Sequence, residues 1–223
     1  MTLTKDRPAE WAAPGMRRMK VLAVGSQKGG AAKSTTSLYL ATRFAEYMGG
    51  TQECPIVGLL DRDGTSKNLS EMLRLHPEMV RPGVTILDGE DLPEQSSGLR
   101  LVVIDTPPGL AAIDSLRSAD LLVVPVIPSE QGVVNLVQYL RNIKGQRVSV
   151  SPHMRLLALL PSAVRNTRLH REVLDAIKDI AGSYDPPLPV LPPIPQRTAI
   201  EEWNLDAREY DAAAKELFEY ARI

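Results

Sequence analysis

A short segment rich in glycine and lysine, from Ser26 to Thr35, carries the residues best suited to bind an anion. It follows the apolar run Val21–Val24 directly, and a pattern of helical spacing comes after it. Gly29 and Gly30 let the backbone approach a ligand closely, and successive backbone N–H groups at a helix N-terminus hold phosphate. The segment therefore predicts a phosphate-binding loop, with an ordinary glycine-rich turn as the alternative.

The side chains of this loop indicate how a nucleotide would be held. Lys33 is placed to reach the β- and γ-phosphates, and the hydroxyl of Ser34 to bind Mg²⁺. The standard pattern has glycine where Ala32 stands. If residue 32 needs a positive φ, alanine costs about 1 kcal/mol and can displace the loop, so binding is expected and turnover depends on this alanine. We expect ATP or ADP to contact Lys28, Gly29, Gly30, Ala31, Ala32, Lys33, Ser34 and Thr35.

Two further segments place carboxylates where apolar runs end. Asp61 and Asp63 close the run that contains Leu59 and Leu60, and Asp105 closes Val102–Ile104. The carboxyl ends of parallel strands form the rim where ligands bind. Asp105 is therefore expected to hold Mg²⁺, directly or through water. For Asp61 and Asp63, a solvated turn or a helix cap is the alternative.

The elements that must position these residues follow from the apolar pattern. Short apolar runs without alternation are typical of strands buried on both faces of a parallel sheet, and they are Val21–Val24, Ile56–Leu60, Leu101–Ile104, Leu121–Ile127 and Leu156–Leu160. Between them, apolar residues recur at helical spacing, as in Leu38, Ala41, Ala45 and Met48. This predicts an α/β fold, a mostly parallel, doubly wound sheet with helices on both faces.

Length and composition fit one globular domain. The chain has 223 residues, a net charge of −1 and a single cysteine, Cys54, which excludes an internal disulfide framework. No stretch approaches the ~20 apolar residues that span a bilayer. We expect residues 1–19 to form a flexible basic arm, or a terminus without function, and residues 20–223 to form one domain of a cytoplasmic protein.

Several of these segments resemble one family. The run Lys28-Gly-Gly-Ala-Ala-Lys-Ser matches the pattern K-G-G-x-x-K-[ST], and Ile104-Asp-Thr-Pro-Pro-Gly is similar to a switch segment of the same proteins. Both resemble the deviant Walker A ATPases, the ParA/MinD superfamily, which includes the ParA partition ATPases, MinD and the nitrogenase iron protein. The resemblance covers roughly residues 20 to 200. It implies a P-loop NTPase fold.

The resemblance also implies roles for single residues. Lys28 would be the signature lysine that reaches across a dimer interface to the partner's nucleotide. Asp63, supported by Asp61, would orient the attacking water, and Pro195 lies in a segment that resembles the loop near the adenine. The sequence departs from the glycine and the Pro-Gln pair of the family at three positions, namely Ala32, Gly64 and Thr65.

A long stretch of the chain, from Gln131 to Arg171, contains no acidic residue. A positive surface of this kind would suit DNA phosphates, and a solvated basic surface with acids nearby in space is the alternative. Tyr139 is the only aromatic residue among the charges, so base stacking and sequence readout are not expected. The candidate DNA-binding residues are Arg165, Arg168 and Arg171, with Arg141, Lys144 and Arg147 as a second group.

With the resemblance, these features predict an ATP-switched partition protein associated with the nucleoid. ATP would close a homodimer that binds DNA nonspecifically, and a ParB-like adaptor would stimulate slow hydrolysis, so that a plasmid, a chromosome or another cargo is segregated. A nucleotide-binding regulator that does not hydrolyse is one alternative, because of Ala32 and Gly64. A MinD-like membrane ATPase is another, disfavoured because Glu201–Ile223 holds seven acidic and three basic residues.

Overall fold

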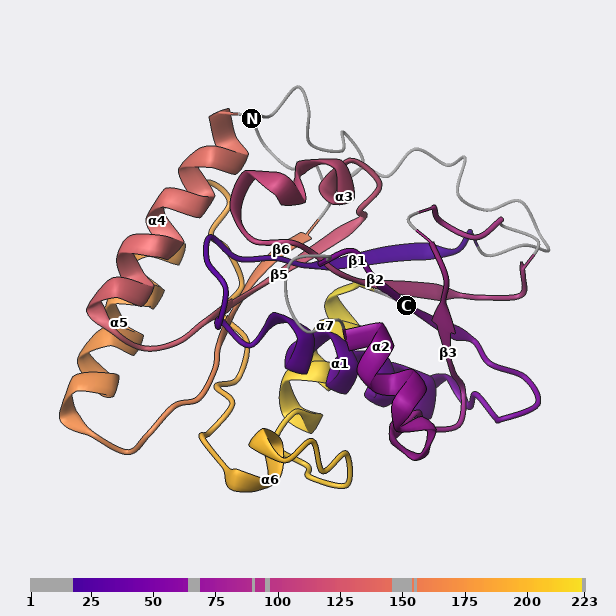
Figure 1. The fold of residues 1–223 in the computed structure, drawn as a ribbon. Coiled ribbons are helices and arrows are strands. Elements are labelled where there is room, and N and C mark those ends of the chain that lie inside the picture. Colours follow the sequence, from indigo (N-terminus) through magenta and orange to yellow (C-terminus); the bar gives the residue numbers. More distant parts are fainter. Residues whose placement is uncertain are drawn as a thin grey trace.

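The computed structural model describes residues 18–63, 69–89, 91–94, 97–145, 154 and 156–221. Within these residues, six parallel strands form one sheet in the order β3-β2-β4-β1-β5-β6 (Figure 1). The strands are β1 (Lys20–Val24), β2 (Val57–Asp61), β3 (Val84–Leu87), β4 (Leu101–Asp105), β5 (Leu121–Val126) and β6 (Leu156–Pro161).

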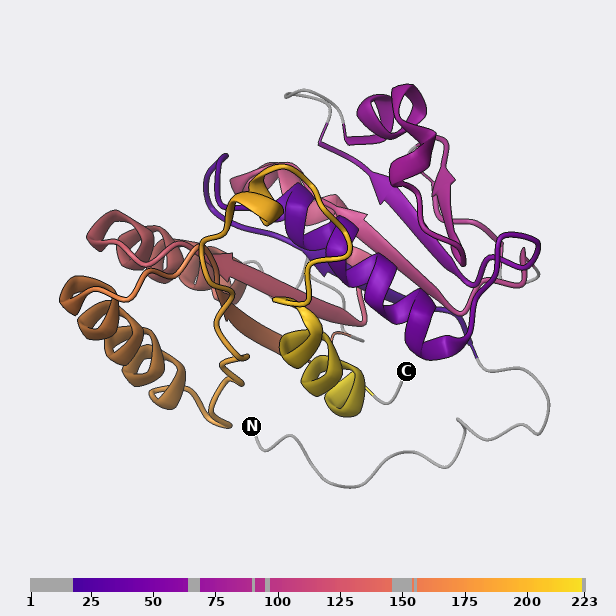
Figure 2. The same cartoon turned by 90° about the horizontal axis from the view of Figure 1, so that it is seen from below.

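Helices cover both faces of this sheet, which confirms the predicted doubly wound α/β architecture. Figure 1 shows α3 on one face and α1 and α2 on the other, and Figure 2 shows α1 and α7 lying across the second face. The helices are α1 (Lys33–Met48), α2 (Leu69–Leu75), α3 (Ile113–Arg117), α4 (Glu130–Gly145), α5 (Arg168–Gly182), α6 (Thr198–Glu201) and α7 (Asp211–Ala221), with 3₁₀ turns η2 (Pro77–Met79) and η4 (Gly109–Ala112).

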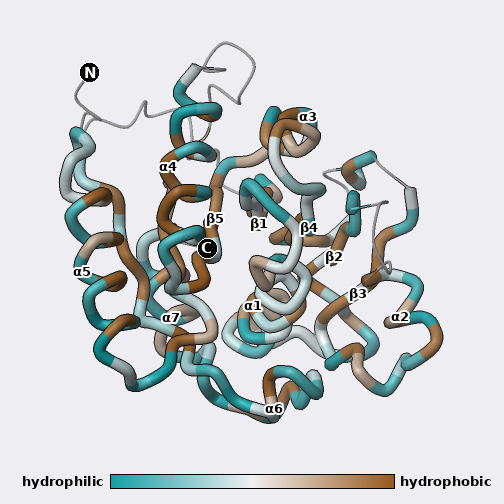
Figure 3. The backbone as a smooth tube through the Cα atoms, turned by 60° about the vertical axis from the view of Figure 1, so that its left-hand side comes forward, coloured by the Kyte–Doolittle hydropathy of each residue, from teal (hydrophilic) through white to brown (hydrophobic). Residues whose placement is uncertain are grey.

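Alternating side chains of each strand enter two separate cores. On β1, Leu22 and Val24 pack in the core that includes α1 and α7, whereas Val21 and Ala23 pack in the core that includes α4 and α5. Figure 3 shows mostly hydrophobic strands between helices in which hydrophilic and hydrophobic residues alternate along the tube. The same alternation on β4 puts Val103 in the first core, so that Asp105, two residues later, faces α1.

Arg43 fixes α1, whose first turn forms part of the candidate site, to the C-terminal part of the chain. Its side chain is 1% exposed and its Nε lies 2.8 Å from Oδ1 of Asp211. Its Nη2 donates to the backbone carbonyls of Leu205 and Ala207. Because a buried guanidinium is stable only with such partners, these contacts keep α1 in one position against α7.

Some elements differ from the expectations. The strand β3 was not expected, because its four residues lie at the sheet edge and only Val84 among them is buried. Val190 forms a single parallel bridge to Leu159 of β6. Met19 is already 2% exposed and belongs to the core, whereas residues 1–17 of the expected arm lie outside the described residues.

Candidate functional site

The loop between β1 and α1, which was predicted to bind phosphate, contains two residues with positive φ. Gly30 has φ 74°, and Ala32 has φ 61° and ψ 27°, so both residues occupy the left-handed region. The Ser26 hydroxyl donates to the Lys28 carbonyl at 2.9 Å and tightens the start of the loop. The positive φ considered for residue 32 is therefore found, and alanine occupies it.

The N-terminus of α1 is arranged to receive an anion. Ala32, the cap residue, has no side chain that could accept from the first-turn N–H groups, and the first turn contains no acidic residue. The helix instead begins with the basic Lys33, where the helix dipole disfavours a cation. First-turn N–H groups have no acceptor within their own helix, so a bound phosphate would satisfy them and the lysine together.

Asp105 is fully buried at the end of β4, next to this helix. Its Oδ2 accepts a hydrogen bond of 2.5 Å from the Ser34 hydroxyl, and its Oδ1 accepts one of 3.2 Å from the hydroxyl of Ser37. The strand register explains the placement, because Asp105 lies beside Val24, the last residue before the loop. Sequence reasoning missed Ser37, although it follows Ser34 by three residues and shares its helix face.

Burial raises the pKa of Asp105 to about 7. The carboxylate of Asp61 contributes to this rise in the pKa, whereas the hydroxyl of Ser34, the ammonium of Lys33 and the hydroxyl of Ser37 oppose it. Asp61 has this effect because it lies beside Asp105 in the register of β2 and β4. A buried carboxylate with a hydroxyl oxygen against it is an oxygen-donor set that fits Mg²⁺.

The predicted lysine and aspartate of the site contact each other. Nζ of Lys33 lies 3.6 Å from Oδ2 of Asp63, and the two residues are only 5% and 6% exposed. Asp61 accepts from the backbone N–H of Asp63 at 2.9 Å and, through its other oxygen, from that of Ser70 at the start of α2. The cap considered as an alternative role for Asp61 is therefore present.

The segment after β4 is hydrogen-bonded to the phosphate loop. The N–H of Gly109 donates to the Ser26 carbonyl at 2.8 Å, and the Thr106 hydroxyl donates to the Val24 carbonyl at 2.8 Å. Gln27 of the loop accepts from the side chain of Asn142 on α4. Gln27 and Asn142 were missed by sequence reasoning, since no pattern relates residues 115 positions apart.

A pocket of about 180 Å³ is lined by the β1–α1 loop, the end of β5 and the first turns of α4. Lys28 lines this pocket and is exposed, so its side chain is accessible from outside the protein. Tyr139 also lines the pocket, and a methyl group added to Gly25 would lie 2.2 Å from its hydroxyl oxygen. Gly25 thus allows α4 to approach the loop.

Pro195 lies at the carboxyl end of the outer strand β6. It forms a parallel bridge with Val164, just after that strand, and the next residue, Gln196, accepts a hydrogen bond from Arg165. The Gln196 amide in turn donates to Glu201. Pro195 is thus on the same rim of the sheet as the β1–α1 loop, and its contact with the adenine stays a prediction.

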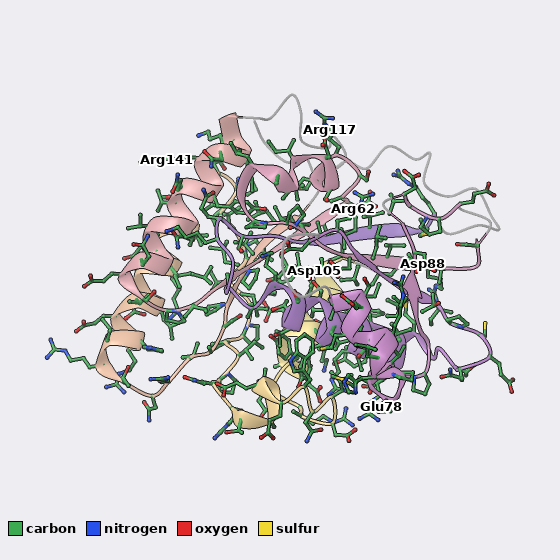
Figure 4. The ribbon with its side chains drawn as sticks, in the orientation of Figure 1. Arg62, Glu78, Asp88, Asp105, Arg117 and Arg141 are labelled. Atoms are coloured by element: carbon green, nitrogen blue, oxygen red, sulfur yellow. The ribbon has the colours of Figure 1, made fainter. Side chains whose placement is uncertain are left out.

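The two groups of basic residues lie at opposite ends of the layer that α4 and α5 form. Arg165, Arg168 and Arg171 are exposed around the start of α5, at the rim. Arg141 lies near the end of α4 (Figure 4), where its charge opposes the rise that burial causes in the pKa of Tyr184, just after α5. A helix of this length separates them by about 20 Å. Lys144 is at the same end as Arg141, and Arg147 is outside the described residues.

The rim arginines have polar partners on their own segment. Arg168 forms an ion pair of 2.7 Å with Glu172, and Arg171 donates to the Asn166 side chain at 3.0 Å. Glu172 is the first acidic residue after the stretch that lacks them. The rim is therefore positive but not free of nearby carboxylates, which is part of what the solvated-surface alternative requires.

Comparison with known families assigns most of the chain. Residues 22–209 match the model of the CobQ/CobB/MinD/ParA nucleotide-binding domain. No curated protein sequence is significantly similar to this chain.

Solved structures share this fold over nearly their whole length. McdA from Cyanothece, as a variant bound to ATP, covers 94% of this chain and 98% of its own, with 17% identity and a TM-score of 0.69. A plasmid partition protein of Borrelia burgdorferi covers 84% of this chain and 96% of its own, with 16% identity and a TM-score of 0.61. Cobyrinic acid a,c-diamide synthase from Mycobacterium smegmatis, with bound ADP and magnesium, covers 87% of this chain and 96% of its own, with 25% identity and a TM-score of 0.60.

Proposed function

The chain belongs to the CobQ/CobB/MinD/ParA nucleotide-binding domain family, and from this premise we propose that it is a ParA-like partition ATPase. In this proposal it binds ATP with Mg²⁺, hydrolyses it slowly and closes a homodimer in the ATP-bound state. The dimer binds DNA nonspecifically, and a ParB-like adaptor stimulates hydrolysis. Partition proteins and McdA among the similar structures support this choice within the family.

The observation that carries the proposal is the group of residues at the start of α1. Lys33, Ser34 and the helix N–H groups point to phosphate, and Ser34 with the buried Asp105 offers oxygen ligands to a divalent cation. Bound Mg²⁺ would neutralise charge on the β- and γ-phosphates. Asp63, adjacent to Lys33, is the residue of this group that we assign to orient the attacking water.

Lys33→Gln tests the nucleotide site. We expect it to abolish ATP binding in calorimetry, because no neighbouring side chain replaces the lost charge. Thermal unfolding of the variant should remain a cooperative transition. Lys144→Gln removes the same charge from the far end of α4 and serves as the control. Unchanged ATP affinity in Lys33→Gln would show that the β1–α1 loop does not bind the phosphates of ATP.

A nucleotide-binding regulator without hydrolysis is the second candidate, and the left-handed alanine at position 32 favours it. Catalysis tolerates a displaced loop much less than binding does. Single-turnover hydrolysis measured with saturating Mg-ATP, DNA and the adaptor separates the two candidates. Hydrolysis above the rate of the Lys33→Gln variant supports the ATPase, and binding without such hydrolysis supports the regulator.

A membrane role receives no support from the helices. None of those in the described part of the chain is long and apolar enough to cross a bilayer. The last helix, α7, contains three acidic residues and one basic residue, whereas a helix that lies on an anionic membrane needs a basic face. Cosedimentation with anionic vesicles in the presence of ATP tests this, and we expect the protein to remain in the supernatant.

A further inference from the structure

Asp63 forms an ion pair with Lys33, the residue that a bound nucleotide would also contact. Its carboxylate lies 3.6 Å from the ammonium of Lys33, and both side chains are more than nine-tenths buried. Solvent and salt therefore screen this attraction only weakly. Lys33 is also the residue on which the proposed function relies for contact with phosphate.

Geometry limits how far a phosphate could be from this carboxylate. If Lys33 kept its contact with Asp63, any phosphate oxygen hydrogen-bonded to Nζ would lie no more than about 6.5 Å from Oδ2 of Asp63. Two negative groups at that distance repel each other strongly in a buried site. Binding of the phosphate and the Lys33–Asp63 pair therefore oppose each other.

The competition between phosphate and Asp63 for Lys33 affects mainly the terminal phosphate of a nucleoside triphosphate. Backbone N–H groups of the loop cradle the α- and β-phosphates, whereas the γ-phosphate depends on the lysine and the metal ion. A diphosphate can thus use the loop while Lys33 stays largely with Asp63. A triphosphate brings further charge toward the carboxylate and needs the lysine more.

We infer that Asp63 determines the preference between nucleoside triphosphate and diphosphate, by competing with the terminal phosphate for Lys33. The inference rests on the proposed nucleotide site and adds a specificity role for this residue. Asp61 accepts a hydrogen bond of 2.9 Å from the backbone N–H of Asp63, which fixes the backbone from which the carboxylate of Asp63 extends toward Lys33. When the terminal phosphate takes Lys33, the carboxylate of Asp63 becomes available to a water molecule beside that phosphate.

Asp63→Asn in the full chain tests the inference. Calorimetry in Mg²⁺ measures the affinities for a non-hydrolysable ATP analogue and for ADP. We expect the analogue to bind on the order of tenfold more tightly to the variant, and ADP to change less, so that the preference for triphosphate rises. Glu71→Gln removes the same charge from the exposed surface of α2, and we expect its preference to equal that of the parent.

Each outcome separates this inference from the function on which it rests. A preference that is unchanged or lower in Asp63→Asn, with a cooperative unfolding transition, would overturn the inference and leave nucleotide binding intact. Failure of the parent to bind either nucleotide would overturn the proposed function instead. Asp63→Ala, which cannot hydrogen-bond to Lys33 at all, is the second variant, and the same rise in preference is expected from it.

Discussion

Alanine at position 32 adopts φ 61° at the point where α1 begins, a conformation in which its Cβ crowds the following carbonyl oxygen. Glycine carries no such strain, although it loses more conformational freedom when the chain folds. The backbone N–H groups near this residue are those proposed to hold phosphate. The strain therefore bears on stability and on catalysis together.

We expect Ala32→Gly to raise the free energy of unfolding by up to about 1 kcal/mol and to increase the rate of ATP hydrolysis. Urea unfolding and single-turnover hydrolysis measure the two effects. Ala212→Gly, at an exposed position of α7, is the control and should lose stability, because its backbone is helical. Equal rates for parent and Ala32→Gly would show that the loop tolerates alanine.

Asp105 links stability to pH through its buried carboxyl group. Its pKa is about 7 in the folded protein, against an ordinary value of 3.8. Between these two values the folded protein keeps the proton that the unfolded chain has lost. The contribution of Asp105 to stability is therefore complete at low pH and decreases as the pH rises from about 4 to 7.

Asp105→Asn removes this dependence. Without Mg²⁺, we expect the variant to gain stability relative to the parent as the pH rises from 5 to 8, by on the order of a few kcal/mol. Thermal unfolding in EDTA at several pH values measures the difference. Asp114→Asn, on the exposed surface of α3, controls for the loss of a carboxylate. A difference that is constant with pH would show that Asp105 is ionised throughout.

At the scale of elements, the segment after β4 contacts the β1–α1 loop through Gly109. Gly109 has φ 63°, its N–H donates to the Ser26 carbonyl, and an added Cβ would lie 3.3 Å from the Gln27 carbonyl oxygen. A side chain at this position is therefore opposed by the backbone conformation and by the neighbouring loop. The two segments stay in register because residue 109 is glycine.

Gly109→Ala should lower the free energy of unfolding by about 1–2 kcal/mol and reduce hydrolysis more than nucleotide binding, because it shifts the loop. Chemical denaturation, calorimetry and single-turnover assays measure these effects. Gly145→Ala, at the end of α4, is the control: an added Cβ there meets no atom of the described residues within 4 Å, and φ is not positive. Because residue 145 is helical, we expect this variant not to lose stability and to keep parental nucleotide binding and hydrolysis. Parental hydrolysis by Gly109→Ala would mean that this contact is dispensable.

At the scale of the whole molecule, the basic residues divide into a rim group and a far group. Arg165, Arg168 and Arg171 are on the rim that also holds the phosphate loop, whereas Arg141 and Lys144 are at the other end of α4. A dimer closed by nucleotide would present two copies of a surface, and the second copy binds DNA at a high effective concentration. The rim group is thus better placed for DNA binding that depends on ATP.

Replacing Arg165, Arg168 and Arg171 with alanine should weaken binding to all DNA sequences alike. The slope of log Kd against log salt concentration should also decrease by up to about 3 per protomer, because fewer counterions are released. Fluorescence anisotropy at several salt concentrations, with ATP, measures both. The far pair Arg141→Ala with Lys144→Ala is the comparison and should have a smaller effect. DNA binding equal to that of the parent in the triple variant would make the rim ordinary solvated surface.

The sequence by itself determined the features that depend on neighbouring residues. Continuous apolar runs predict buried parallel strands, and five of the six strands were found this way. A glycine-rich turn between a strand and a helix, and an acid at a strand end, are also local patterns, and they located the β1–α1 loop and Asp105 at the carboxyl edge of the sheet. That these residues bind phosphate and Mg²⁺ stays a prediction. The edge strand β3 was missed, since partial burial leaves no continuous apolar run.

Only the tertiary structure decided which of these residues meet. The pairing of Lys33 with Asp63, and of Ser37 with Asp105, depends on the order of β1, β4 and β2 in the sheet, which local patterns do not specify. The same holds for the basic residues. They are close in one acid-free stretch of sequence, but the parallel packing of α4 and α5 puts the two groups at opposite ends of the helices, because a helix converts separation along the chain into distance along its axis.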